Sequence, residues 1–388
     1  MQRLIKRLHC PSPKLATRPA THRSYTSSAP AAKRPSNGPK PALDIKHIRQ
    51  NPELYETTCR ERLYESQAGN PAKIIALSEQ LVQLQHSGRG LRERANLLRR
   101  VLANPATLTD DSTLGDLKAL SREELRADAR RVKEELAGIV RAEADARREV
   151  EALALALPNL TSDETPRGAE PRLLRHVGRR PEFDEEGRSS GSGAARIWRS
   201  HAHIGAELGL LDFAAAAQSS GWGWYYLVEM LAWTRADPAQ AREVFEEMLD
   251  VQTEMLESLG LHARVLEMPT ADLGASAARK VDMEAWFPSR QEHSDGWGEV
   301  SSASICTDYQ TRRLQTRARP GGRASGSGGG DDVEFPWTLN GTALAVPRVL
   351  AALLEVGWDE RARTVAIPEC LRPWMDGLDK IGPPTNRN

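Results

Sequence analysis

The sequence of 388 residues contains few cysteines, no C-x-x-C pair and no long apolar run. Four widely separated cysteines disfavour a zinc ribbon and a disulfide scaffold, and they are typical of a reducing compartment. The longest apolar candidate, Thr342 to Leu354, is interrupted by Pro347 and Arg348, and it falls short of the ~18 residues of a membrane helix. We therefore expect a soluble protein of two or three domains, without zinc and without a membrane partner.

Acidic residues are absent from the N-terminus, although the whole chain has a formal net charge of zero. Residues 1–43 hold nine Lys or Arg and no Asp or Glu. An Arg-rich, Ser-rich and acid-free N-terminus is typical of an organellar transit peptide, and the lack of an apolar core disfavours a secretory signal. We expect residues 1–40 to be a transit segment for the mitochondrial matrix, cleaved somewhere after Arg23. A disordered basic tail is the alternative.

Two later stretches carry apolar residues at steps of three and four. The first runs from Ile74 to Leu102 and is broken only by Gly88, and the second runs from Leu125 to Leu157 with Glu143 as the exception. Narrow seams of this length are typical of coiled coils, and residues 103–124 between them have turn composition. We expect an antiparallel hairpin of two helices, roughly 45 Å long at ~1.5 Å per residue.

Basic residues gather toward the end of the first helix and the start of the second. In an antiparallel pair both sets fall in the same outer half, as the phosphates of a nucleic acid would require. Acidic residues interrupt the set, so an ordinary solvated helix face is the alternative. The candidate contacts are Arg89, Arg92, Arg99, Arg126, Arg130 and Lys133.

The second half of the chain holds the candidate chemistry. Charged and apolar residues alternate over 280–285, which predicts a strand with one charged face and one apolar face. Glu299 is followed by Ser301 and Ser302, and such oxygen groups suit a Mg²⁺–nucleotide, although the bare pattern also occurs by chance. His201 and His203 have no third ligand nearby, so a metal site there is disfavoured.

Other features set limits on the second half. Neither a P-loop nor a Rossmann glycine pattern is present, which disfavours both kinds of nucleotide site. Residues 320–332 have the composition of a flexible surface loop. Residues 236–259 are expected to form an amphipathic helix, with an apolar stripe at Val244, Met248, Val251, Met255 and Leu259.

Taken in order, these segments resemble the seryl-tRNA synthetases, in their mitochondrial fungal form. The stretches that carry the resemblance are DIKHIRQNPELYETTCRER (44–62), LPNLTSDETPRG (157–168), GEVSSASICTDYQTRRL (298–314) and LNGTALAVPR (339–348). The resemblance covers nearly all of residues 44–376. It implies an α+β protein: a tRNA-binding coiled-coil arm (41–158), then a class II catalytic domain (159–388) with an antiparallel sheet flanked by helices.

The resemblance also implies a reaction and roles. The family uses ATP and Mg²⁺ to convert L-serine to seryl-adenylate, and it then transfers the seryl group to serine tRNA. Glu299 and Ser302 resemble the Mg²⁺ ligands, and Arg348 resembles the arginine that pairs with an ATP phosphate, a role suited to a fixed guanidinium. Residues lining the nucleotide would be Glu299, Val300, Ser301, Ser302 and Arg348, and those lining the serine pocket Glu229, Asn340 and Thr342. The alternatives are a structural ion pair for Arg348 and a solvent-facing Glu229.

The sequence departs from the family pattern at one point. In the family, GWGWYYL (221–227) is followed by a large block that holds the dimer-interface motif, a serine loop and the second catalytic motif. Here Leu227 runs directly into Val228. Part of the sheet is therefore expected to be missing, together with the interface of the family's homodimer. The second catalytic motif of the family holds an arginine that binds the α-phosphate of ATP. Its loss alone should slow the reaction by ~10²–10³.

Three functional hypotheses follow. The first is a mitochondrial serine–tRNA ligase by descent, with an internal deletion and impaired activity. The second is a non-catalytic tRNA-binding protein derived from such an enzyme. The third is a coiled-coil interaction protein without a role in RNA binding. Retention of Glu299, Asn340, Thr342 and Arg348 favours the first over the second.

Overall fold

The computed structural model describes residues 42–103, 120–179, 199–210, 227–290, 295–318 and 334–383 of the chain. The expected transit segment at 1–40, the expected loop at 320–332 and the GWGWYY stretch at 221–226 lie outside these residues. None of the described helices is both long enough and apolar enough to cross a membrane.

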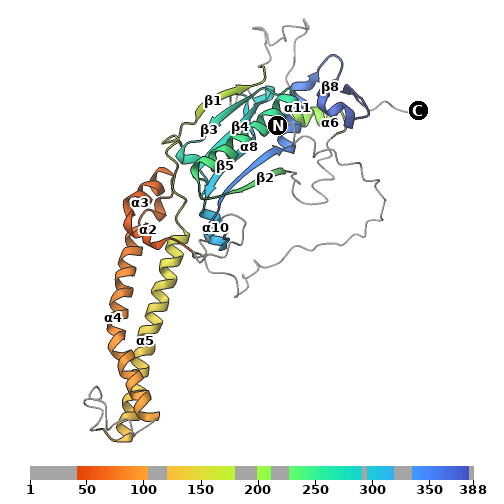
Figure 1. Cartoon of the computed structure of the whole chain (residues 1–388). Helices are drawn as coiled ribbons and strands as arrows, with labels where there is room; N and C mark the ends of the chain where they lie inside the picture. The colour runs from red at the N-terminus through yellow and green to blue at the C-terminus, as the bar shows by residue number, and fades with distance from the viewer. Residues whose placement is uncertain are drawn as a thin grey trace, which may run out of the picture. The chain divides into compact units, whose positions relative to one another are not determined.

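The first part of the described chain is helical, as the seams predict. Helices α4 (Asn70–Ala103) and α5 (Arg122–Leu155) lie side by side (Figure 1). Both have 34 residues, slightly more than their apolar seams suggest, because polar residues form the first turns. At the start of α5, for example, the Ser121 side chain accepts a hydrogen bond from the backbone of Glu124 in a capping box. Shorter helices precede the pair: α2 (Ile45–Gln50), α3 (Pro52–Glu61) and η1 (Glu65–Gln67).

One interaction explains both exceptions in the seams. Glu143 is buried at a seam position of α5 and receives the Arg92 guanidinium from α4 at 2.5 Å. A Cβ atom at Gly88 would lie 3.0 Å from a guanidinium nitrogen of Arg92. Glycine at 88 therefore leaves room for Arg92 to cross the seam and neutralise Glu143.

The second part of the chain is built on one antiparallel sheet of six strands in the order β1-β3-β4-β5-β6-β2. Every neighbouring pair is antiparallel, so the predicted α+β class is confirmed. The strands are β1 (Arg172–Val177), β2 (Leu227–Thr234), β3 (Ala263–Glu267), β4 (Arg279–Trp286), β5 (Trp297–Thr307) and β6 (Trp337–Ala345). The helices of this part are α6 (His201–Glu207), α8 (Pro238–Ser258), α10 (Tyr309–Leu314) and α11 (Val346–Gly357), and the short turns are η4 (Thr270–Asp272) and η5 (Pro288–Arg290).

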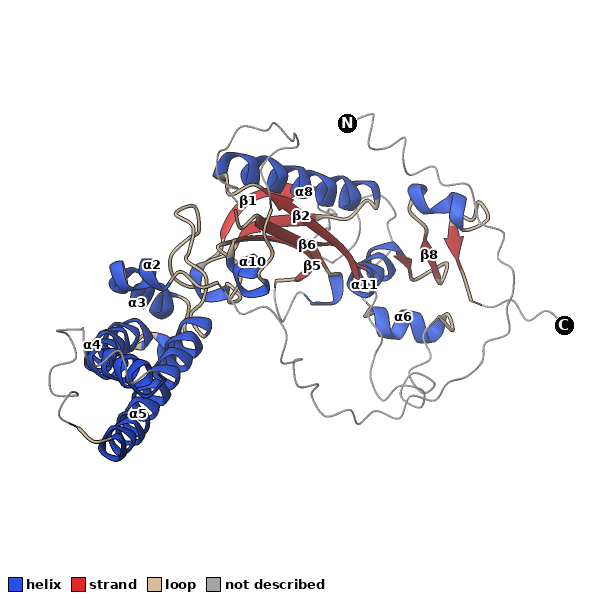
Figure 2. Cartoon of the chain, turned by 60° about the horizontal axis from the view of Figure 1, so that its bottom comes forward, coloured by secondary structure: helices blue, strands red, loops and turns tan. Residues whose placement is uncertain are grey.

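The sheet has one apolar face and one polar face. The apolar residues of strand β4, Val281, Met283 and Ala285, are fully buried in a cluster with Phe245 and Leu249 of α8. Figure 2 shows α8 lying along this side of the sheet. Residues on α11 join the same cluster. The predicted alternation over 280–285 is confirmed, and it leaves Lys280, Asp282 and Glu284 on the opposite face.

The predicted stripe of α8 is partly wrong. The buried positions are Ala241, Phe245, Met248, Leu249, Gln252 and Leu256. Of the predicted stripe, Met248 is buried and Val244 and Leu259 pack at the edge of the core cluster, whereas Val251 and Met255 are partly buried outside that cluster. The prediction took only apolar residues as the buried stripe and so left out Gln252. This residue is fully buried, and its Nε2 donates to the carbonyls of Ser302 at 2.7 Å and Thr342 at 2.9 Å. A buried amide is tolerated when it is hydrogen-bonded.

A small second sheet follows α11. It consists of β7 (Trp358–Asp359), β8 (Thr364–Ala366) and β9 (Lys380–Ile381), in that order, with the turn η6 (Glu369–Trp374). A separate apolar cluster joins this sheet to α6 and the end of α11. Its members are Ile204, Leu208, Leu354, Trp358 and Val365.

Candidate active site

Polar side chains from four adjacent strands line up on the polar face of the sheet. Asp282 of β4 pairs with Ser302 of β5, Ser302 pairs with Thr342 of β6, and Thr342 pairs with Glu229 of β2. Directly opposed residues in antiparallel strands share a face, with Cβ atoms ~5 Å apart. The structure therefore brings three predicted site residues, Ser302, Thr342 and Glu229, into one row. The row ends at a fourth residue, Asp282, for which no role was predicted.

Glu229 and Thr342 are directly connected. The hydroxyl of Thr342 donates to the Glu229 carboxylate at 3.2 Å. Glu229 is exposed on the edge strand β2, yet this bond fixes its carboxylate toward the row rather than toward bulk solvent. Two of the three predicted serine contacts thus present adjacent oxygens on one face.

The third predicted serine contact, Asn340, lies opposite Ser304 of β5, one step along the same face. Its side-chain oxygen accepts a hydrogen bond from the buried thiol of Cys306 at 3.1 Å. The carbonyl of Cys306 in turn accepts from the side chain of Asn159 at 2.9 Å. Asn159 lies in the segment that follows α5, so the amide of Asn340 is held by contacts that begin at the base of the arm.

Glu299 and Arg348 meet beside the row, where Glu299 of β5 lies opposite Glu284 of β4. The guanidinium of Arg348 lies 3.3 Å from the Glu299 carboxylate and donates to the Glu299 carbonyl at 3.1 Å. Both side chains are partly exposed. Arg348 sits in the first turn of α11, directly after β6, which explains how a motif distant in sequence reaches β5.

The two residues between Glu299 and Ser302 point away from this face. A register shift in the β4–β5 pair falls here, and it leaves Val300 fully buried in the apolar cluster. Ser301 is also buried, and its hydroxyl donates to the carbonyl of Thr342 at 2.5 Å. Any contact of Val300 or Ser301 with a nucleotide on the polar face would therefore be made by the backbone.

Asp282 is the functional candidate that sequence reasoning missed. Its carboxylate is buried, with one oxygen 2.7 Å from the ammonium of Lys280, while the other oxygen, Oδ1, has no hydrogen-bond partner. Burial raises the pKa of Asp282 to about 6, and the charge of Lys280 opposes that rise. The charge alternation placed Asp282 on this face, but no sequence signal distinguished it from Lys280 or Glu284.

Each histidine of the predicted pair bonds to a protein group through Nδ1. His201 Nδ1 lies 2.7 Å from the buried carboxylate of Glu355, and His203 Nδ1 lies 2.7 Å from the Ser200 hydroxyl. Within the described ranges, no group of three or more His, Cys, Asp or Glu side chains is arranged to hold a metal ion. A Mg²⁺ site in this part of the chain would therefore need hydroxyl, water or substrate oxygens in addition to carboxylates.

The basic surface of the arm differs in one respect from the sequence prediction. Arg92 is committed to Glu143 across the seam, so its charge is already neutralised. The remaining five candidates are exposed, and none of them forms an ion pair within the described part of the arm. They are Arg89, Arg99, Arg126, Arg130 and Lys133.

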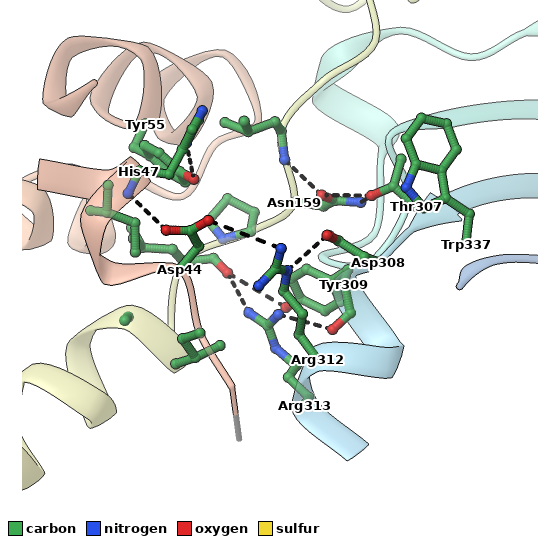
Figure 3. A pocket seen from close by; sticks show the side chains of 16 residues that line it. Asp44, His47, Tyr55, Asn159, Thr307, Asp308, Tyr309, Arg312, Arg313 and Trp337 are labelled. Carbon is green, nitrogen blue, oxygen red and sulfur yellow. Dashed lines mark hydrogen bonds and ion pairs between the residues drawn. The ribbon is translucent and has the colours of Figure 1, made fainter. Parts of the chain in front are cut away.

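A cavity of about 320 Å³ lies where the base of the arm meets the sheet (Figure 3). Its charged groups are bonded to protein: Arg312 binds Asp308 at 2.7 Å, and Arg313 donates to the carbonyl of Leu157 at 3.1 Å. Beside it, the buried Arg62 donates to the carbonyls of Asn159 and Gly274. The pocket lies between the base of the arm and the sheet. Arg62 and Arg313 there donate to backbone carbonyls, and buried carbonyls need such partners.

Comparisons with known proteins agree with this architecture. The family described as "Seryl-tRNA synthetase N-terminal domain" matches residues 42–161, and "tRNA synthetase class II core domain (G, H, P, S and T)" matches residues 232–357. The mitochondrial serine–tRNA ligase of Saccharomyces cerevisiae is 43% identical over 150 residues, which are 39% of this chain and 31% of that protein. That of Bos taurus is 42% identical over 174 residues, 42% of this chain and 30% of that protein. These alignments thus span less than a third of either relative.

A bacterial relative aligns over a longer range. The serine–tRNA ligase of Rubrobacter xylanophilus is 28% identical over 462 aligned positions, which cover 88% of this chain and 99% of that protein. Since 88% of 388 residues is about 341, about 120 aligned positions have no counterpart in this chain.

The fold is that of solved seryl-tRNA synthetases. The structure from Pyrococcus horikoshii complexed with ATP has a TM-score of 0.71 at 20% identity, covering 88% of this chain and 100% of that chain. The cytoplasmic serine–tRNA ligase from Naegleria fowleri in complex with AMP has a TM-score of 0.70 at 19% identity, covering 88% of this chain and 99% of that chain. By its family matches, this chain carries a seryl-tRNA synthetase N-terminal domain at residues 42–161 and a class II tRNA synthetase core domain at residues 232–357.

Proposed function

We propose that this chain is a serine–tRNA ligase by descent, which binds ATP and L-serine on the polar face of its sheet and serine tRNA along its arm. The observation that carries the proposal is the row Asp282–Ser302–Thr342–Glu229, flanked by Glu299 and Arg348. The matched N-terminal and core domains, and the relatives named serine–tRNA ligase, support the same reaction.

The Glu229 end of the row fits serine as the substrate. The Glu229 carboxylate would accept hydrogen bonds from the ammonium of the amino acid. The Asn340 amide and the Thr342 hydroxyl would bond its polar side chain. A pocket that bonds the substrate hydroxyl rejects alanine, because its polar groups would otherwise stay unpaired.

The Asp282 end of the row, together with Glu299 and Arg348 beside the row, fits a nucleotide. Arg348, once released from Glu299, presents a fixed guanidinium suited to a phosphate of ATP. The orphaned buried oxygen of Asp282, the Glu299 carboxylate and the Ser302 hydroxyl form an oxygen donor set that fits Mg²⁺, and Glu299 and Ser302 would hold the ion. When bound, Mg²⁺ supplies neutralisation of phosphate charge. In the proposed activation step, the serine carboxylate attacks the α-phosphate of ATP and pyrophosphate leaves. A hydroxyl of the 3′-terminal ribose of the tRNA then attacks the seryl carbonyl of the adenylate, the bond to phosphate breaks, and AMP leaves.

The arm would supply tRNA affinity. Exposed arginines and lysines release counterions when they meet phosphates, and this gives salt-sensitive binding. We place the division between the arm (41–158) and the catalytic part (159–388) at Pro158, and we assign residues 1–40 to a transit segment for the mitochondrial matrix. The relatives named mitochondrial serine–tRNA ligases support this location.

We also propose that the family block between Leu227 and Val228 is missing, together with the first and second motifs and their dimer interface. The about 120 aligned positions without a counterpart support this. So does strand β2, which has no described strand on its outer side and exposes Val228, Leu231 and Trp233 there. Without that block the phosphate-binding groups are incomplete, so the activation step should be strongly slowed.

A second function follows from the same gap. A chain that keeps the arm but lacks part of the sheet would bind serine tRNA without charging it. The arm has stabilising contacts of its own, the capping box at Ser121 and the Arg92–Glu143 ion pair between its helices. These contacts support an arm that functions without the missing block.

Binding of serine tRNA to the full chain tests both functions together. We expect a complex whose affinity falls steeply with salt and falls further when Arg126 and Arg130 are replaced by Ala. The matched control is Arg148→Ala, which removes an exposed arginine nearer the base of the arm. Equal binding of serine tRNA and an unrelated tRNA, or no binding at low salt, would contradict the proposal.

A further inference from the structure

Asp282 holds a buried carboxylate oxygen without a partner. The residue is 4% exposed, and Oδ1 has no hydrogen-bond partner. Leaving a charged oxygen unpaired in the interior is costly, so such groups are usually satisfied by a partner or an ion. The neighbouring carboxylates are satisfied differently: Glu284 binds Arg264 at 2.6 Å and Glu299 binds Arg348 at 3.3 Å.

The position of this oxygen points to the kind of partner. Asp282 lies directly opposite Ser302 on β5, and Glu299 lies on the same face of β5, opposite Glu284, the next residue of β4 on that face. Two carboxylates and a hydroxyl within one face of a sheet are the hard oxygen donors that a divalent cation prefers.

Building on the proposed function, we propose that Asp282 is a further ligand of the divalent cation held by Glu299 and Ser302, and that Lys280 occupies this carboxylate when the cation is absent. Lys280 sits two residues away on the same strand, with its ammonium 2.7 Å from Oδ2 of Asp282. Its charge and that of the cation compete for one carboxylate. Lys280 therefore weakens metal binding, and it prevents the empty site from holding an uncompensated negative charge.

Two variants with opposite expected effects test the proposal. Binding of Mn²⁺ to the full chain, without ATP or tRNA, is measured by electron paramagnetic resonance titration. Asp282→Asn should weaken Mn²⁺ binding by roughly 10- to 100-fold, the usual effect of removing a group that supports a metal site. Lys280→Gln should tighten Mn²⁺ binding, because the competing cation is gone. The matched control is Glu284→Gln, on the same strand and face, which should change Mn²⁺ affinity by less than about threefold.

Several results would overturn the proposal. Unchanged Mn²⁺ affinity in a folded Asp282→Asn chain would mean that water or a structural role explains the orphaned oxygen, as would a wild-type chain that binds no Mn²⁺. Equal losses in Asp282→Asn and Glu284→Gln would mean a general charge effect. If instead Asp282→Asn abolishes serine-induced thermal stabilisation and leaves Mn²⁺ binding intact, the partner is the serine ammonium. Should Asp282→Asn not fold, Lys280→Gln decides alone, since a purely structural lysine predicts no tightening. Failure of tRNA binding would contradict the proposed function, but it would not change what the Mn²⁺ affinities say about Asp282.

Discussion

The guanidinium of Arg348 lies 3.3 Å from the carboxylate of Glu299, and it also donates to the backbone carbonyl of Glu299 at 3.1 Å. In the proposed site Arg348 binds the phosphates of ATP, and Glu299 binds the cation that accompanies them. Without that ligand they neutralise each other. Because both side chains are partly exposed, the pair contributes little to stability and gives way easily to the nucleotide.

The first prediction concerns this pair. Arg348→Ala should weaken ATP binding by about tenfold or more, because a charge-assisted bond to phosphate is lost, while the free energy of unfolding should change by less than about 1 kcal/mol. Isothermal titration with ATP and a denaturation curve measure the two effects. Arg361→Ala, another exposed arginine of this part, is the control. A large loss of stability with unchanged ATP affinity would show a structural ion pair instead.

The second prediction concerns the seam of the arm. Gly88→Ala should gain about 1 kcal/mol of helix propensity but push against the Arg92 guanidinium. The full gain should therefore be seen only in an Arg92→Ala background. Arg92→Ala alone should destabilise the arm by about 1–3 kcal/mol, because Glu143 stays buried without its nearest partner. Thermal melts of the four chains form the double-mutant cycle, and strict additivity would argue against the crossing.

The third prediction concerns pH and Asp128. The hydrogen bond from Arg131, with a second from Arg94, lowers the pKa of Asp128 below its ordinary value. A carboxylate with a lowered pKa in the folded state stabilises the fold above its unfolded pKa, and this contribution is lost as the pH falls through the folded pKa. The stability difference between wild type and Asp128→Asn should therefore be constant above about pH 5 and shrink below about pH 4. A difference that does not change with pH would exclude this ion pair as its source.

The fourth prediction concerns the open edge of β2. A long edge strand with exposed apolar residues and few charges invites pairing with other chains, and on β2 Leu231 is 75% exposed and Trp233 60%. Light scattering should show self-association of the full chain, and Trp233→Lys should reduce it. The control is Leu173→Lys on β1, the other edge strand, which already carries Arg172, Arg175 and His176. A chain that stays monomeric at high concentration would contradict the open edge.

Much of the fold could be predicted from periodicity. The two seams predicted the arm because they repeat over four heptads, and the alternation over 280–285 predicted both faces of β4. The stripe of α8 was partly wrong because a buried glutamine, Gln252, faces the sheet and hydrophobicity alone cannot identify it. Likewise, Gly88 and Glu143 interrupted the apolar seams without an evident reason in the sequence. Arg92, which links them, is four residues after Gly88 and on the opposite helix from Glu143.

The site was less predictable than the fold. Resemblance supplied Glu299, Ser302, Thr342 and Glu229, and the structure places them on one face, but their chemical roles remain predictions. Asp282 could not be found from sequence, because its distinguishing property is an oxygen left unpaired by burial. Such a property depends on strand register and on what covers the face, and neither is written in the local sequence.

Serine-dependent exchange of pyrophosphate into ATP shows whether this chain can activate serine. It isolates the activation step, needs no tRNA, and can be run on the chain starting near Pro41 with Glu299→Ala as the control. We predict salt-sensitive binding of serine tRNA but no exchange above the control, because the groups that hold the α-phosphate lie in the missing block. Serine-dependent exchange well above that of Glu299→Ala would show that the remaining residues build a working site, and would contradict the proposed loss of activation.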